Sequence, residues 1–321
     1  MELIKIDLQN NKIPSNIVAC IGEFDGIHLA HQKLIEEVEK ISIEKNIPSS
    51  IITFDPHPDF VLNKNSDNTY ITPLNEKIKF VNDNYNIDYF IVINFTEQLS
   101  KLPFDEFYDL FLKTINTIVI GYDFRFGYKG LGNESNLKKL HDNVIVIEQI
   151  KLNNEKIGSK NIINSLLNGN IEDANKMLGR LYKISGIVSK GSQIGSKIGY
   201  PTANINIEEN FCLLKKGVYA VRVRINNKNY NNNCCYYLGI CNYGYNPSFN
   251  KIIKPRLEVH IFNFNKDIYD EYIEVEFIEN IREEKVFPSV DDFLNQLKKD
   301  CEYCNNKYGG IYETISCRSD G

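Results

Sequence analysis

Residues 17–31 read IVACIGEFDGIHLAH, a short apolar run that ends in a glycine turn and leads into a helical pattern. The run IVACIG is almost continuously apolar, which is typical of a strand buried on both faces of a sheet. Apolar residues then recur at helical spacing through residues 28–46. A buried strand, a turn and a helix in this order predict one repeat of an α/β fold with a parallel sheet.

The same strand pattern recurs through the first half of the chain. SSIITF is followed directly by DPHP, which neither a helix interior nor a central strand accepts. With helical segments between the runs, the first domain is predicted to be a parallel sheet with helices on both faces. We assign this domain to residues 1–181, with further strands at 49–54, 89–94, 117–122 and 144–150.

Strict alternation of apolar and polar residues replaces this pattern after residue 182. In GVYAVRVRI the residues Tyr219, Val221, Val223 and Ile225 share one face, and LEVHIF and YIEVEFIE alternate likewise. Short, frequent strands of this kind predict a small antiparallel β-barrel. A helix follows, with Ser289 as its N-cap and Asp292 three residues on. We assign the barrel and this helix to residues 182–310 and a tail to 311–321.

Composition narrows the possible functions. A single core rarely grows beyond roughly 250–300 residues, so 321 residues favour two domains. A net charge of −5 argues against a general nucleic-acid surface, and we expect no nucleic-acid partner. No apolar run approaches the ~20 residues of a membrane span, and the N-terminus lacks the order of a signal peptide. We therefore expect a cytoplasmic protein without a membrane partner.

The eight cysteines are scattered, as expected of reduced thiols in the cytosol. Cys301 and Cys304 form one CxxC, but no second pair with zinc-ligand spacing accompanies it. Together with Leu294 and Leu297 they form a stripe at helical spacing. We predict that both cysteines pack in the core.

Two histidines stand where the first strand and its turn lead into the helix. His28 and His31 lie three residues apart, on one face of its first turn. Ligands of α/β sheets bind at the carboxyl ends of the strands, and a helix N-terminus offers N–H groups and a positive dipole to phosphate. Imidazole donors there can follow charge that develops on a phosphoryl group. The alternative is a pair of surface or metal-ligand histidines; their position favours phosphate.

A second constellation lies at residues 191–204, GSQIGSKIGYPTAN. Gly191, Gly195 and Gly199 recur every four residues, and glycines let the backbone turn and approach a phosphate closely. Thr202 and Asn204 offer neutral oxygens of the kind that Mg²⁺ accepts beside substrate phosphates and water. The alternative is a glycine-rich surface loop before a strand.

Three motifs in the first half resemble the adenylyltransferase half of the bacterial bifunctional riboflavin kinase/FMN adenylyltransferase family. They are GEFDGIHLAH, TFDPHP at 53–58 and GYDFRFGYKGLGN at 121–133. The resemblance implies a nucleotidyltransferase-type, Rossmann-like domain in which the FMN phosphate attacks the ATP α-phosphate. It implies catalytic roles for His28 and His31, ATP binding by Gly22, Phe24, Asp25 and Gly26, and flavin or nucleotide binding by Phe54, Asp123 and Arg125.

The second half resembles the riboflavin kinase domain of the same family. The matching segments are residues 181–205, 216–223, 239–249 and 255–300, which include PTAN and the downstream LEVH. The resemblance implies that Thr202 and Asn204 hold Mg²⁺ and the ATP phosphates, with Gly191, Gly195, Gly199 and Pro201 forming the ATP-binding loop. It implies that Glu258 is the catalytic base and that Tyr219, Asn246 and Phe249 face the flavin.

Alternatives remain for several of these residues. Glu258 could be an exposed strand glutamate paired with Arg256 or Arg282, and Tyr219 could belong to the core. In the first domain, Ala30 and Ile163 stand where the family has glycine and arginine.

The sequence therefore favours an enzyme that uses ATP and Mg²⁺ to convert riboflavin to FMN and FMN to FAD. The first alternative is a riboflavin kinase with an inactive first domain, which Ala30 and Ile163 would favour. The second is a flavin- or nucleotide-binding protein without catalysis.

Overall fold

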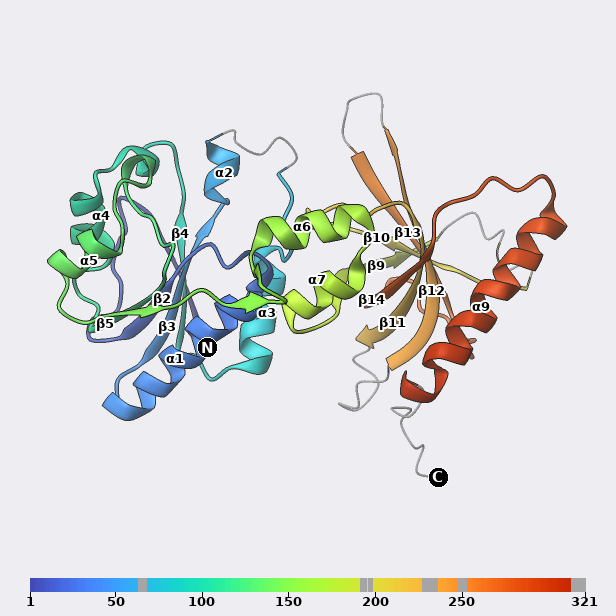
Figure 1. The fold of residues 1–321 in the computed structure, drawn as a ribbon, viewed down its shortest axis with the longest axis horizontal. Coiled ribbons are helices and arrows are strands. Elements are labelled where there is room, and N and C mark those ends of the chain that lie inside the picture. The colour runs from blue at the N-terminus through green and yellow to red at the C-terminus, as the bar shows by residue number, and fades with distance from the viewer. Residues whose placement is uncertain (63–67, 191–194, 196–198, 227–235, 248–252, 313–321) are drawn as a thin grey trace. The chain divides into compact units, whose positions relative to one another are not determined.

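A computed structural model describes residues 1–62, 68–190, 195, 199–226, 236–247 and 253–312 (Figure 1). The chain folds into two compact units, Met1–Ser159 and Lys160–Gly321. Residues 160–181, which we assigned to the first domain, belong to the second of these compact units. A functional domain boundary at residue 181 remains a prediction.

The first unit contains a six-stranded parallel sheet with the order β1-β4-β3-β2-β5-β6. The four further strands predicted in this half and the strand in IVACIG are all present. The edge strand β1 was not predicted, because three of its five residues are exposed and it lacks a continuous apolar run. The strands are β1 Glu2–Ile6, β2 Val18–Ile21, β3 Ser49–Asp55, β4 Tyr89–Asn94, β5 Thr117–Gly121 and β6 Val144–Ile147.

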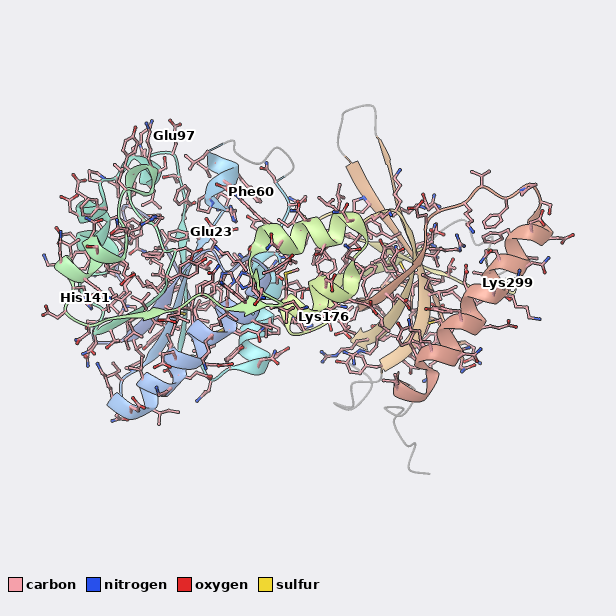
Figure 2. All side chains as sticks on the ribbon, viewed as in Figure 1. Glu23, Phe60, Glu97, His141, Lys176 and Lys299 are labelled. Atoms are coloured by element: carbon pink, nitrogen blue, oxygen red, sulfur yellow. The ribbon has the colours of Figure 1, made fainter. Side chains whose placement is uncertain are left out.

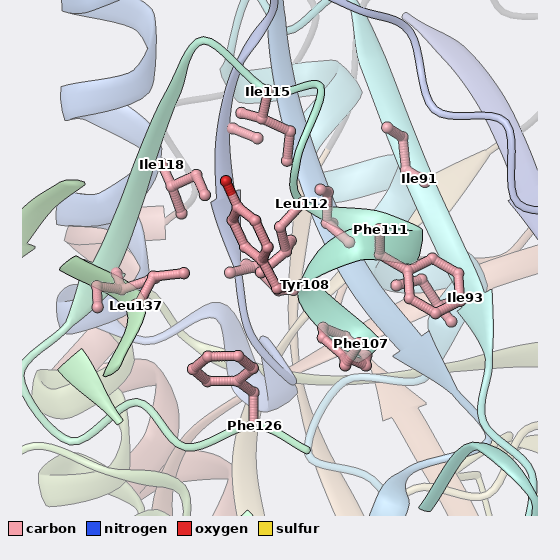
Figure 3. Packing of buried hydrophobic residues seen from close by; sticks show 14 of the residues in the cluster. Ile91, Ile93, Phe107, Tyr108, Phe111, Leu112, Ile115, Ile118, Phe126 and Leu137 are labelled. Carbon is pink, nitrogen blue, oxygen red and sulfur yellow. The ribbon is translucent and has the colours of Figure 1, made fainter. Parts of the chain in front are cut away.

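Both faces of this sheet are buried, as predicted. Ala19 and Ile21 of β2 belong to one apolar cluster, whereas Val18 and Cys20 belong to another. Figure 3 shows the first cluster, where α4 packs Phe107, Tyr108 and Phe111 near β4 and β5. The helices of the unit are α1 Leu29–Lys45, α2 Pro58–Val61, α3 Leu74–Asn84, α4 Phe104–Phe111 and α5 Glu134–Leu140, with short 3-10 turns η1 Asp25–Ile27, η2 Leu99–Lys101 and η3 Tyr128–Gly130 and the hairpin β7 Lys151–Leu152 and β8 Glu155–Lys156.

The second unit contains a closed antiparallel barrel with the order β10-β13-β12-β11-β14-β9, which confirms the predicted architecture. Helix α7 packs on β9 and β14. The elements are α6 Ser159–Asn168, α7 Ile171–Leu178, β9 Tyr182–Ser189, β10 Ala203–Asn206, β11 Gly217–Asn226, β12 Tyr236–Pro247, β13 Ile253–Ile261, β14 Tyr272–Arg282 and α9 Val290–Tyr312.

Aromatic side chains fill the inside of the barrel. The rings of Tyr182, Tyr219 and Tyr243 surround that of Phe277, with ring centroids 6.0, 5.3 and 6.4 Å from it. All four residues are buried. Side chains alternate between the two faces of a strand. Glu258 and His260 alternate with buried residues of β13 and therefore lie on its outer side.

Helix α9 covers part of that outer side. Cys304 and Tyr308 are buried against Val218, Ala220 and the neighbouring apolar residues of the barrel wall, and Cys301 packs at the margin. This confirms the predicted core packing of the two cysteines. In the described residues no group of three or more His, Cys, Asp or Glu could hold a metal ion. The predicted N-cap is also present, since the Ser289 hydroxyl oxygen accepts from the Asp292 N–H at 3.1 Å.

A carboxylate on β14 fastens α9 to the barrel. Glu279 accepts hydrogen bonds from the Tyr303 and Tyr308 hydroxyls and from the Lys307 ammonium, at 2.7–3.1 Å. Burial raises the pKa of Glu279, but the three donors outweigh it and the net pKa is lowered. Arg282 and Asp300 form a second, mostly buried pair at 2.9 Å.

None of the helices in the described part of the chain combines the length and the apolar character that a membrane crossing requires.

Substituting Glu279→Gln should lower the stability of the second unit by about 1–3 kcal/mol at neutral pH, because charge-assisted bonds to three donors are weakened. Since the folded-state pKa of Glu279 is lowered, its contribution is complete above the ordinary value of 4.5 and is lost as the pH falls through the folded-state value. The difference in the free energy of unfolding between wild type and variant should therefore become smaller at acidic pH. Urea unfolding with hydrogen exchange of residues 290–312 measures this. Glu302→Gln on the exposed side of α9 is the control, and equal effects of both variants would contradict the prediction.

Candidate active sites

The turn after β2 has an unusual backbone. Gly22 still donates to the Ile52 carbonyl at 3.1 Å, but Phe24, Gly26 and Ile27 then adopt positive φ angles of 49°, 82° and 37°. Such angles are costly for residues other than glycine. Phe24 and Ile27 are both buried in the apolar cluster beneath the turn, which offsets this cost. Burial of these two side chains therefore fixes the backbone conformation of the turn up to the residue that precedes α1.

His28 and His31 meet at the start of α1. Their rings stack with centroids 3.7 Å apart and planes 13° apart, and the Phe24 ring lies 5.0 Å from that of His31. The His31 N–H donates to Nδ1 of His28, which is the N-cap of the helix. A neutral His28 therefore carries its ring proton on Nε2. The structure brings the two predicted histidines together at a helix N-terminus, where phosphate binding is favourable.

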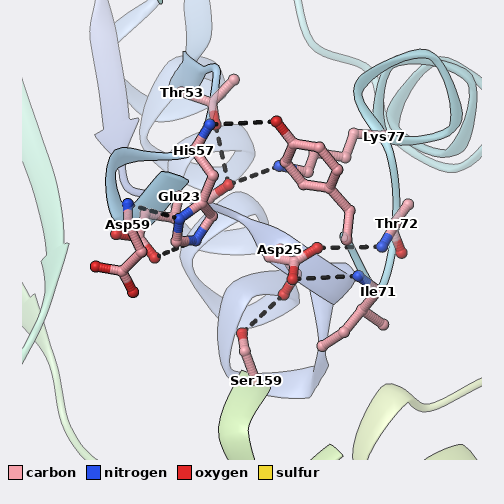
Figure 4. A network of polar contacts seen from close by, with 10 residues as sticks. Glu23, Asp25, Thr53, His57, Asp59, Ile71, Thr72, Lys77 and Ser159 are labelled. Atoms are coloured by element: carbon pink, nitrogen blue, oxygen red, sulfur yellow. Dashed lines mark hydrogen bonds and ion pairs between the residues drawn. The ribbon is translucent and has the colours of Figure 1, made fainter. Parts of the chain in front are cut away.

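Asp25 is buried, and its carboxylate is bound by backbone groups. Its two oxygens accept from the N–H groups of Ile71 and Thr72 at 3.2 and 3.1 Å, and its carbonyl accepts from the Ser159 hydroxyl at 3.1 Å (Figure 4). The predicted ATP-binding residue therefore ties the turn to residues 71–72 and to Ser159 of the same unit. Gly22, Phe24 and Gly26 belong to the same turn.

A cluster of charged residues lies beside this turn and was not predicted. The side chain of Glu23, which is labelled in Figure 2, pairs with Nε2 of His57 at 2.9 Å. The Glu23 carbonyl accepts from Thr53 Oγ1 at 3.1 Å and from Lys77 Nζ at 2.9 Å (Figure 4). One signal was available in the sequence. Lys77 occupies an apolar-spaced position of α3, between Leu74 and Val81.

Burial and charge act in opposite directions within this cluster. Burial lowers the pKa of Lys77, and the nearby carboxylates of Asp25, Asp55 and Glu23 oppose this only in part. Burial also acts to lower the pKa of His57, but the hydrogen bond and charge of Glu23 outweigh it and the net pKa is raised. The carboxylates of the cluster thus stabilise the charged forms of His57 and Lys77 against the cost of burial.

The remaining predicted residues of this unit lie at the ends of β3 and β5. Phe54 is half-buried and packs edge-on against Phe95, with centroids 5.7 Å apart. Asp123 and Arg125 are exposed in the loop after β5, and Asp123 pairs with Lys156 at 2.6 Å. Because the strands are parallel, Phe54 and Asp123 lie at the same edge of the sheet as Gly22.

In the barrel unit, Asn204 and Glu258 are directly paired. Asn204 of β10 lies opposite Glu258 of β13, and Glu258 also lies opposite Asn242 of β12. Paired residues on one face of an antiparallel ladder have Cβ atoms about 4.5–5.5 Å apart. The predicted metal ligand and the predicted base are therefore neighbours, on the outer side of the barrel wall.

The ion pair that we considered as the alternative role of Glu258 is also present. Arg256 Nε lies 3.1 Å from Glu258 Oε1, with the arginine side chain 62% and the glutamate 27% exposed. Arg282 is engaged elsewhere, with Asp300. An exposed pair of this kind contributes little to stability, so it does not by itself account for a glutamate at this place.

The turn before β10 is tied to the same strand. His260 Nδ1 lies 2.8 Å from the Pro201 carbonyl, and since a carbonyl only accepts, the imidazole donates from Nδ1. The Tyr200 ring lies 5.3 Å from that of His260. At Gly195 a Cβ would clash with the Tyr200 carbonyl oxygen, and Gly199 has a φ of 83°, so both positions require glycine. Strand β13 thus carries Glu258, the predicted base, and through His260 holds the turn that precedes β10.

One predicted residue lies in the barrel core, and others lie outside the described residues. Tyr219 is fully buried and its hydroxyl donates to the Lys215 carbonyl, so it packs in the barrel core, the alternative left open, and a contact with the flavin stays a prediction. Asn246 belongs to β12, but its side chain lies outside the described residues, as do Gly191 and Phe249.

Thr202 and Asn204 suit a magnesium ion by the chemistry of their donors. Mg²⁺ takes oxygen ligands, keeps several waters and binds through few protein groups plus substrate phosphates. Thr202 is exposed and Asn204 half-exposed, so both oxygens can reach a nucleotide, and Glu258 adds a negative charge across the ladder.

A parallel sheet with a histidine-bearing helix N-terminus and a barrel with a Thr-Ala-Asn turn define a transferase that acts on nucleotides in two separate units. The FAD synthetase family matches residues 10–161, and the riboflavin kinase family matches residues 178–308. The chain belongs to the bifunctional riboflavin kinase/FMN adenylyltransferase family and is a transferase with ATP as co-substrate.

Relatives with this double activity in their names match nearly the whole chain. The protein of Buchnera aphidicola subsp. Schizaphis graminum is 42% identical and covers 94% of this chain and 97% of its own length. That of Bacillus subtilis is 34% identical and covers 88% and 90%. Among solved structures, "Macrolide-efflux Protein from Streptococcus pneumoniae" has a TM-score of 0.84 and 31% identity, over 94% of this chain and 99% of that one. The efflux activity named there is a statement about that protein, and we carry over only the shared fold.

Substituting His260→Ala should weaken MgATP use in riboflavin phosphorylation by about 2- to 10-fold, because the Pro201 carbonyl loses its donor. His260→Asn retains an amide N–H near the position of Nδ1 and should recover most of the loss. The KM for ATP in FMN formation, measured by chromatography of the flavins, checks this. FAD formation from FMN by the other unit is the internal control. Equal kinetics for the alanine variant and wild type would refute a positioning role for this hydrogen bond.

Proposed function

We propose that the barrel unit phosphorylates riboflavin to FMN and that the sheet unit adenylylates FMN to FAD, each with ATP. The observation that carries the kinase assignment is the register of β10 with β13, which sets Asn204 opposite Glu258. The family match over both units supports pairing the two reactions in one chain.

For the kinase step we propose Glu258 as general base. As the riboflavin 5′-hydroxyl oxygen attacks the γ-phosphorus of ATP, its proton passes to the Glu258 carboxylate and ADP leaves. Arg256 pairs with Oε1 of this carboxylate, so the proton is expected at Oε2. His260 holds the Pro201 carbonyl, so Thr202 and the ladder residue Asn204 stay in place beside it.

We propose that Thr202 and Asn204 hold Mg²⁺ together with the ATP phosphates. Their neutral oxygens leave the charge of the ion available to the phosphates. When bound, the ion neutralises charge on the phosphates during transfer. Gly195 and Gly199 let the backbone of the same loop approach the nucleotide.

For the adenylyl step we propose that the N-terminus of α1 binds the ATP polyphosphate. His28 donates from Nε2 and His31 stacks on it, so both rings face the same anionic group. An oxygen of the FMN phosphate attacks the α-phosphorus, the bond to the β-phosphate oxygen breaks, and pyrophosphate leaves. Gly22, Phe24, Asp25 and Gly26 shape the turn, while Phe54, Asp123 and Arg125 lie at the same sheet edge for the flavin side or the nucleotide.

A kinase with a silent first unit is the second candidate. Ala30 adds a methyl group in the first turn of α1, and Ile163 replaces a guanidinium that could bind phosphate in two places. Incubating the protein with riboflavin, ATP and Mg²⁺ and separating the flavins decides between them. FMN with FAD supports the first proposal, FMN alone supports the second, and neither product contradicts both. A cytoplasmic location remains a prediction.

Substituting Glu258→Gln should lower the rate of FMN formation by about 10²- to 10⁴-fold, because the amide cannot accept the proton. Riboflavin binding, followed by flavin fluorescence, should persist. Arg256→Ala is the matched control, since it removes the ion pair but leaves the carboxylate. If both variants lose activity equally, the ion pair and not proton transfer accounts for Glu258.

Substituting His28→Asn should lower the rate of FAD formation from FMN by about 10²- to 10³-fold. Asparagine is a good N-cap, so α1 keeps its first hydrogen bond while the donor at Nε2 is removed. FMN formation from riboflavin in the same preparation should be unchanged. Unaltered FAD formation would exclude the imidazole from the adenylyl site.

A further inference from the structure

Lys77 is a buried cation that the proposed chemistry does not use. Its side chain extends from α3 into the unit, its exposed fraction is 1%, and its Nζ donates to the Glu23 carbonyl at 2.9 Å. Its ammonium also lies 5.4 Å from the centroid of the Tyr70 ring. Burying an ammonium group is costly, and Leu74, Ile78 and Val81 fill the same stripe of the helix with apolar side chains. Packing alone would favour an apolar side chain at this position, so packing does not account for a lysine here.

The acceptor of Lys77 is a well-defined point of the backbone. The Glu23 carbonyl also accepts from Thr53 Oγ1 at 3.1 Å, so both of its lone pairs are occupied (Figure 4). This carbonyl belongs to the peptide that precedes Phe24, the first residue of the turn with a positive φ angle. Two donors on one carbonyl fix the plane of that peptide and hence the direction in which the chain enters the turn.

Charge supplies the second argument. The carboxylates of Asp25, Asp55 and Glu23 all act on Lys77. Even with His57 paired to Glu23, the carboxylates of Asp25 and Asp55 would oppose a polyphosphate at the nearby N-terminus of α1. Lys77 compensates part of this charge from beneath the turn without contact with solvent.

We propose that Lys77 is a positioning residue of the adenylyltransferase site, which holds the Glu23 carbonyl and thereby sets the turn that presents His28 and His31 to the ATP polyphosphate. Thr53 acts on the same carbonyl as its second donor. This inference rests on the proposed binding of polyphosphate at α1.

Three variants test it in the full-length protein. Lys77→Met removes the donor and the charge at similar length, Thr53→Val removes the second donor, and Thr53→Ser restores it. Lys77→Met should raise the KM for ATP in FAD formation by about 10- to 100-fold, since a charge-assisted hydrogen bond is lost. Thr53→Val should raise it by about 2- to 10-fold, and Thr53→Ser should return it toward wild type. FMN binding, measured by quenching of flavin fluorescence, should stay unchanged in all three.

The controls separate a positioning role from general damage. Riboflavin phosphorylation by the other unit reports on the integrity of each preparation, and Lys79→Met, two residues further along α3, is the matched lysine control. The double variant Lys77→Met with Thr53→Val should fall short of the product of the single effects, because both donors serve one carbonyl. Multiplicative effects would overturn the shared role.

Two further outcomes decide the remaining cases. A wild-type KM for ATP in Lys77→Met overturns the proposal, as does a wild-type KM in a folded Thr53→Val protein if Lys77→Met fails to fold. If His28→Asn also keeps full FAD formation, the placement of polyphosphate at α1 has failed. If His28→Asn loses it while Lys77→Met does not, only the role of Lys77 has failed.

Discussion

The backbone hydrogen bonds between β10 and β13 set the register on which the proposed kinase site depends. They place Asn204 opposite Glu258, and a shift of one residue would turn either side chain to the other face of the barrel wall. The register is protected from such a shift because Ile205 on β10 and Leu257 and Val259 on β13 are buried on the inner side. Core packing inside the barrel therefore fixes the positions of the proposed site residues on its outer side.

In the first unit, burial and charged groups together hold the turn that leads into the site. Its turn between β2 and α1 has a backbone path that two non-glycine residues would not adopt freely. Burial of Phe24 and Ile27 holds it from one side, and the hydrogen bonds to Glu23 and Asp25 hold it from the other. The apolar and the polar contacts together fix the position of the backbone that leads into α1.

Much of the fold follows from local patterns in the sequence. Continuous apolar runs predicted the five strands β2 to β6. Alternation of apolar and polar residues predicted the barrel and the outward direction of Glu258 and His260. The edge strand β1 gave no such signal, because only one of its residues is buried. Helical periodicity also predicted the packing of Cys301 and Cys304, because residues three and four apart share one face of a helix.

The candidate sites divide in the same way. The sequence by itself predicted His28, His31, Thr202 and Asn204 as site residues from turn position and donor type, which are local properties. The family resemblance added Glu258, and all five roles remain predictions. Only the tertiary structure decided that Glu258 lies across the ladder from Asn204, that Tyr219 belongs to the core, and that Lys77 supports the Glu23 carbonyl. These contacts join segments that are far apart in the chain, as Lys77 and Glu23 are at a separation of 54 residues, and no local pattern encodes a pairing at that distance.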